Sequence, residues 1–118
     1  MSWTVKIKHT RPNTGVEFYD LNAEYRVTEN TALAVSDQEH INSIKAIATT
    51  FEDTGKQVST SSSLSENELE LTKTFVYRDE ASRDEFIDDS AVIAWMFARS
   101  TYYTENDINM DILQNEST

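Results

Sequence analysis

Residues 64–97, LSENELELTKTFVYRDEASRDEFIDDSAVIAWMF, contain a strand that leads directly into a helix. Apolar side chains recur every second residue in the first half and would share one face of a strand. The series comprises Leu69, Leu71, Lys73, Phe75 and Tyr77, and Lys73 is its one polar residue. Asp79 then offers a helix N-cap, and the apolar spacing changes to about 3.6 residues. The stretch predicts a strand over residues 68–78 whose apolar face contacts helices.

The composition is that of one folded domain. The chain has 118 residues, of which 38% are hydrophobic, and it contains two Gly and one Pro. Its net charge of −11 disfavours nucleic-acid and anionic-membrane partners, because Lys and Arg carry phosphate binding. The lack of cysteine excludes disulfides and thiol chemistry. We expect a single domain over residues 1–113, a frayed tail over residues 114–118, and a cytoplasmic protein without a signal peptide or membrane span.

The rest of the chain supplies the other elements. Strict alternation predicts a half-buried strand over residues 3–9. Residues 36–39 have the spacing of a capping box, which predicts a helix that begins there and ends near Gly55. Residues 57–64 predict a polar edge strand, with a solvated loop as the alternative. Residues 88–90 indicate a second helix cap, and residues 108–113 a last strand, with a helical turn as its alternative. Residues 16–35 are expected to hold a short strand or helical turn.

The order strand, helix, strand, strand, helix, strand predicts an α+β fold of the ferredoxin-like βαββαβ type, with two helices on one face of an antiparallel sheet. In that arrangement the first strand lies beside the third. Lys6 and Lys8 would then lie near Glu68 and Glu70 on the outer face of the sheet. The element order alone predicts the topology, so this charge match is an independent test of it.

The second helix carries more apolar surface than one sheet face can cover, because residues 91–98 are almost uniformly apolar. Such an excess is typical of a subunit interface. The candidate interface residues on this helix are Val92, Trp95 and Met96. Those on the outer face of the third strand are Thr72, Thr74 and Val76.

Residues 71–86, which run from Leu71 to Phe86, resemble the third strand and second helix of dimeric α+β-barrel domains, the superfamily that contains antibiotic-biosynthesis monooxygenases. The shared features are a strand that ends in an aromatic residue, an acidic cap, and a helix with an apolar anchor such as Phe86. The chain is also similar to short uncharacterised proteins of marine tailed phages of the cyanophage type, at Arg11-Pro12, Gly55-Lys56, residues 63–65 and residues 71–75. These resemblances imply the fold, a homodimer, and a place in the host cytoplasm or virion. They imply no activity.

No pattern of residues predicts catalysis or a cofactor. His9 lies on the inward face of the first strand and His40 in the first helix, and nothing in the sequence places them together. Residues 107–111 begin like a calcium loop, but Ile112 and Thr118 occupy the positions that need Gly and a carboxylate. A metal site, a catalytic residue and a cofactor are therefore not predicted.

We expect a non-catalytic homo-oligomeric accessory or structural protein that acts through protein contacts. The alternative is a small cofactor-independent oxygenase or ligand-binding protein of the dimeric α+β-barrel type. Its pocket would be lined by aromatic side chains, with candidates Trp3, Trp95, Tyr102 and Tyr103. A third hypothesis is an acidic protein that captures a basic partner through salt-sensitive contacts. A closed cavity with a polar group inside it would favour the ligand-binding alternative.

Overall fold

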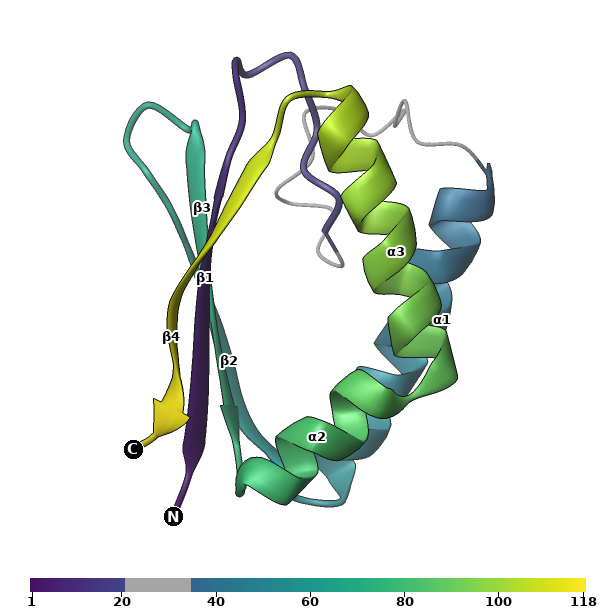
Figure 1. Ribbon diagram of the computed structural model, residues 1–118, viewed down its shortest axis with the longest axis vertical. Coiled ribbons are helices and arrows are strands. Elements are labelled where there is room, and N and C mark those ends of the chain that lie inside the picture. The colour runs from purple at the N-terminus through teal and green to yellow at the C-terminus, as the bar shows by residue number, and fades with distance from the viewer. Residues whose placement is uncertain (21–34) are drawn as a thin grey trace.

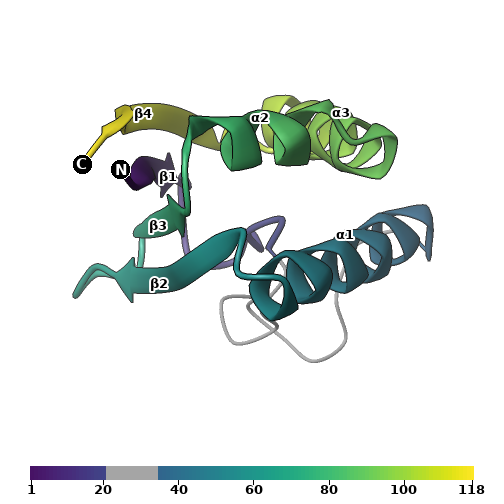
Figure 2. The ribbon, with the colours of Figure 1, turned by 90° about the horizontal axis from the view of Figure 1, so that it is seen from below.

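The structure is a computed structural model that describes residues 1–20 and 35–118, with the side chain of residue 39 alone described among residues 35–41. The elements are β1 (Trp3–Thr10), α1 (Val35–Asp53), β2 (Gln57–Leu64), β3 (Glu70–Tyr77), α2 (Glu80–Asp88), α3 (Ser90–Glu105) and β4 (Asn109–Ser117). All three helices lie on one side of the sheet, and the two termini lie side by side (Figure 1; Figure 2).

The sheet is antiparallel, with strand order β2-β3-β1-β4. This order is compatible with the ferredoxin-like arrangement, and it confirms the predicted α+β class and the pairing of the first strand with the third. Lys8 Nζ lies 3.8 Å from Glu70 Oε2, so the expected charge match forms between these two residues. Residues 57–64 form the edge strand that the sequence predicted, rather than a loop.

The helix boundaries follow from local capping. Asp79 Oδ1 accepts a hydrogen bond of 2.8 Å from Ser82 N at the start of α2. Asp89 Oδ1 accepts one of 2.8 Å from Ala91 N, so the chain restarts as α3 where a second cap was predicted. Gly55, at φ 74°, ends α1 in the left-handed conformation that a glycine adopts at low cost.

The segment after β1 turns into the interior. Arg11 holds it there by donating hydrogen bonds to Glu68 O at 2.8 Å and Val16 O at 3.0 Å. Phe18 and Tyr19 are fully buried as a result, and they join side chains of α1, α3 and β3 in the core. Residues 16–20 form no strand or helix, and the remainder of the segment expected to hold one lies outside the described residues.

The C-terminal end corrects one prediction. Residues 114–117 are not a frayed tail but continue β4, in which Ser117 pairs with Trp3. Strand pairing uses backbone groups, so polar side chains do not prevent it, and the edge of β1 supplies the partners. The register shifts between Lys6 and Ile7, which pair with Gln114 and Ile112 and leave Leu113 as a bulge.

On α3, the residues predicted for the interface turn toward the domain interior, and the interface itself stays a prediction. Val92 and Trp95 are buried within the domain and Met96 is half-buried, so they pack inward. The exposed apolar residues of this helix are Ile93, at 53% exposure, and Phe97, at 75%. A nearly uniform apolar run does not show which of its faces turns inward. Thr72, Thr74 and Val76 pair with β1 residues on the outer face as expected, and their role in an interface stays a prediction.

Candidate functional site

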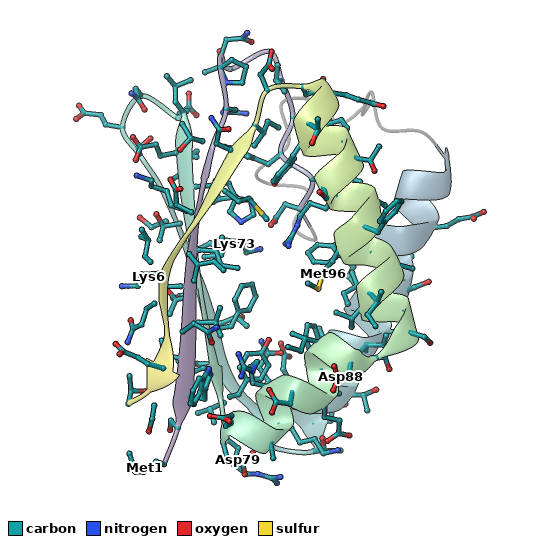
Figure 3. The ribbon with its side chains drawn as sticks, viewed as in Figure 1. Met1, Lys6, Lys73, Asp79, Asp88 and Met96 are labelled. Atoms are coloured by element: carbon teal, nitrogen blue, oxygen red, sulfur yellow. The ribbon has the colours of Figure 1, made fainter. Side chains whose placement is uncertain are left out.

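A cavity of about 240 Å³ lies between the inner face of the sheet and the helices. Its sheet wall is formed by side chains of β1 and β3, and its helix wall by side chains of all three helices. Figure 3 shows Lys73 extending from the sheet toward the helices and Met96 from α3 toward the sheet, whereas Lys6 points away on the outer face. Most of the wall is apolar or aromatic, including Val5, Ile7, Ile44, Phe75, Trp95 and Met96.

Exposed side chains of the cavity lining lie on β4 and α2. Ile112 of β4 is 67% exposed although it lines the cavity, and Ile87 of α2 is also exposed. Arg83 lies beside these residues, where its guanidinium stacks over Trp3 at 4.9 Å and donates to Asn115 Oδ1 at 2.9 Å. A small molecule could therefore reach the apolar interior from this edge without unfolding the domain.

Lys73 and Asp20 form an ion pair inside the cavity, with their side chains 11% and 4% exposed. The lysine is the polar residue that interrupted the apolar face of the third strand in the sequence. Asp20 comes from the segment that Arg11 holds in the interior. The pair explains how a lysine is accommodated on the buried face of a central strand.

Arg99 is a second cation in the cavity wall and is only 8% exposed. Its guanidinium stacks over Trp95 at 4.5 Å from the ring centroid. Burial lowers the pKa of Arg99, while Tyr103, Asp20 and Tyr19 oppose that shift. An arginine keeps its charge in proteins even so, because its intrinsic pKa is so high.

His9 lies beside these cations and is buried. Its Nδ1 is joined to Tyr103 Oη by a hydrogen bond of 2.8 Å. Burial, followed by the positive charges of Arg99 and Lys73, lowers the pKa of His9 from 6.5 to about 3. The imidazole is therefore neutral near pH 7, and it can contribute a hydrogen bond but not a charge.

The structure brings together some of the aromatic residues proposed to line a pocket and separates others. Trp95 lines the cavity and Tyr103 supports His9 behind its wall. Trp3 is the first residue of β1, where its Nε1 donates to Asn115 Oδ1 at 2.7 Å, and Tyr102 Oη donates to Glu17 O at 2.9 Å. The side chain of His40 lies outside the described residues.

Sequence reasoning did not find Arg99. A signal was present, because Arg99 continues the buried stripe of α3 through Val92, Trp95 and Tyr103, which are three or four residues apart. A charged residue in register with a buried stripe is uncommon, since buried charge is costly without a partner. The apolar run of residues 91–98 ends one residue before Arg99, so the predicted apolar surface did not include it.

Within residues 1–20 and 35–118, no group of three or more His, Asp or Glu side chains is arranged to hold a metal ion. None of the described helices is long and apolar enough to cross a bilayer. Comparisons of the chain with family models, curated proteins and solved structures found no match.

Proposed function

We propose that this protein binds a small organic molecule in the cavity between its sheet and its helices. The observation that carries the proposal is a largely apolar cavity of about 240 Å³ into which a few polar side chains converge. Ligand sites in proteins share this combination of apolar walls and a small number of polar groups. The volume exceeds the roughly 150 Å³ of a cavity that holds benzene, so a ligand of about ten non-hydrogen atoms would fit.

Binding is better supported than oxygenase chemistry. A cofactor-independent oxygenase needs a base that takes a proton from its substrate, and such a base works best with a pKa near the working pH. His9 is the histidine in the described cavity wall, and its pKa of about 3 makes it a poor base near pH 7. The polar groups of the site are better suited to recognition than to proton transfer.

A fragment titration followed by NMR tests the binding function. Fragments of about ten non-hydrogen atoms should shift the indole N–H signal of Trp95 and the amide signals of residues lining the cavity. Met96→Trp should abolish these shifts, because the larger ring would occupy the space into which Met96 points (Figure 3). Met110→Trp is the matched control, since Met110 is outside the described lining and is 39% exposed. Shifts that survive in Met96→Trp, or that never occur in the wild-type protein, would refute the proposal.

A homodimer is a second candidate, favoured by the exposed Ile93 and Phe97, one turn apart on α3. A dimeric α+β barrel would instead join two copies through the outer sheet face at Thr72, Thr74 and Val76. Sedimentation of Phe97→Glu and Thr74→Glu distinguishes the two arrangements, since a charge in either interface would dissociate it. Val58→Glu, at an exposed position of β2, is the control. A wild-type monomer at micromolar concentration would exclude both.

A further inference from the structure

Two hydrogen-bond donors in the cavity wall have no acceptor among the described residues. They are Arg99 Nε and Trp95 Nε1, both buried, and they lie one turn apart on α3. The guanidinium of Arg99 also forms no ion pair within residues 1–20 and 35–118. Buried donors are almost always paired in folded proteins, so two such donors in one cavity call for an acceptor from outside the chain.

The charges around the cavity lead to the same conclusion. The described lining includes three cationic side chains, Lys73, Arg83 and Arg99, and one carboxylate, that of Asp20. Asp20 already pairs with Lys73. Among the described residues, this excess of cations in the lining is unexpected in a chain whose net charge is −11, and positive charge without a partner in an apolar cavity is costly. An anionic group beside Arg99 would remove that cost.

We infer that the ligand of this cavity is a small monoanionic carboxylate with an apolar body, whose carboxylate binds the guanidinium of Arg99. This inference rests on the proposed binding function and specifies its ligand. The planar guanidinium presents parallel N–H groups that match the two oxygens of a carboxylate, and Trp95 Nε1 supplies a further donor. The apolar body would contact Val5, Ile7 and Phe75 of the sheet wall.

A phosphate ester fits this site less well than a carboxylate. A dianion costs more to bring out of water, and protein phosphate sites meet that cost with several backbone N–H groups at a helix start or with clustered cations. Here the cavity is mostly apolar, Lys73 is already paired, and Arg83 contacts Asp84 and Asn115. The buried guanidinium of Arg99 is matched to one negative charge.

The test compares carboxylates with their neutral amides in the wild-type protein. The two pairs of probes are phenylacetate with phenylacetamide, and hexanoate with hexanamide, titrated at pH 7 and followed by calorimetry and by the Trp95 indole signal. Each carboxylate should bind at least about tenfold more tightly than its amide, because hydrogen bonds to charged groups are the stronger ones. Equal binding of acid and amide would overturn the inference and leave the binding function standing. Failure of all four probes to shift cavity signals would count against both.

Variants then assign the preference to Arg99. Arg99→Met keeps much of the side-chain length and should reduce the acid-to-amide ratio to about one, while Arg99→Lys should keep part of it. Arg78→Met, at an exposed arginine outside the described lining, should leave the ratio unchanged. If Arg99→Met does not fold, the wild-type comparison still tests the preference for carboxylates. A reduced acid-to-amide ratio in Arg99→Lys then still assigns that preference to Arg99. A full acid preference retained in Arg99→Met would overturn the assignment.

Discussion

Lys73 of the central strand β3 and Asp20 of the segment after β1 form a buried ion pair, with the Asp20 side chain 4% exposed. The pair ties a segment of irregular backbone to the sheet across the cavity. It also places the carboxylate of the described cavity wall beside Lys73, whereas Arg99 in the same wall forms no ion pair among the described residues.

Breaking this pair should destabilise the protein. Lys73→Met would leave the buried Asp20 carboxylate with less compensating charge, and we expect the free energy of unfolding to fall by about 3 kcal/mol. Urea denaturation followed by circular dichroism measures the change. Lys6→Met is the control, because Lys6 lies on the same sheet but on its outer face (Figure 3), and it should cost less than about 0.5 kcal/mol. Equal effects of the two substitutions would contradict the role of the pair.

Arg99→Met should behave in the opposite way in the ligand-free protein. Because the guanidinium is buried and has no ion-pair partner among the described residues, its replacement by an apolar side chain should leave the free energy of unfolding unchanged or raise it, by about 1 kcal/mol. Denaturation without ligand, beside Arg78→Met, provides the measurement. A loss of more than about 2 kcal/mol would show that Arg99 stabilises the fold rather than the bound ligand.

The buried histidine should make stability depend on pH. The pKa of His9 is about 3 in the folded protein and 6.5 in the unfolded chain, so between these values the unfolded chain binds more protons. Its contribution to stability is complete above pH 6.5 and is lost as the pH falls toward 3. Between pH 7 and pH 5 the free energy of unfolding should decrease by about 2 kcal/mol on this account.

NMR titration of the imidazole signals checks the His9 prediction directly. His9→Gln and His40→Gln assign the two histidine signals, and the one lost in His9→Gln should not titrate above pH 4. His9→Gln should also reduce the loss of stability between pH 7 and pH 5. A His9 signal that titrates near pH 6.5 would show that the imidazole is not buried as described.

The start of α3 depends on one side chain. Asp89 Oδ1 accepts hydrogen bonds from Ala91 N at 2.8 Å and from Val92 N at 3.3 Å, so Asp89→Ala should reduce the free energy of unfolding by about 1 kcal/mol. Asp89→Asn should restore most of it, since an amide oxygen also caps. Asp88→Ala, at the preceding exposed residue, is the control for loss of charge alone. No difference between Asp88→Ala and Asp89→Ala in urea denaturation would contradict the cap.

Local patterns in the sequence were sufficient for most of the secondary structure. These patterns depend on residues a few positions apart, so the sequence alone predicts them. They are the alternating side chains in β1 and β3, the serine-rich edge strand, and the caps at Asp79, Asp89 and Gly55. The element order then limited the topology to few choices, and the pairing of Lys8 with Glu70 agrees with the one predicted. The strand conformation of residues 114–117 was not predicted, because their side chains are polar and their partner strand lies at the other end of the chain.

Residues 64–97 by themselves determined a strand, a capped helix and an unusual lysine on the inward face. The tertiary structure decided what that lysine contacts, which face of α3 turns inward, and that a cavity remains between the layers. These features depend on the insertion of Phe18 and Tyr19 from a distant segment and on the separation of helices and sheet. No periodicity encodes that separation, because it arises from packing between residues far apart in the chain. The buried Arg99 guanidinium, which has no ion-pair partner among the described residues, is likewise visible only in the tertiary structure.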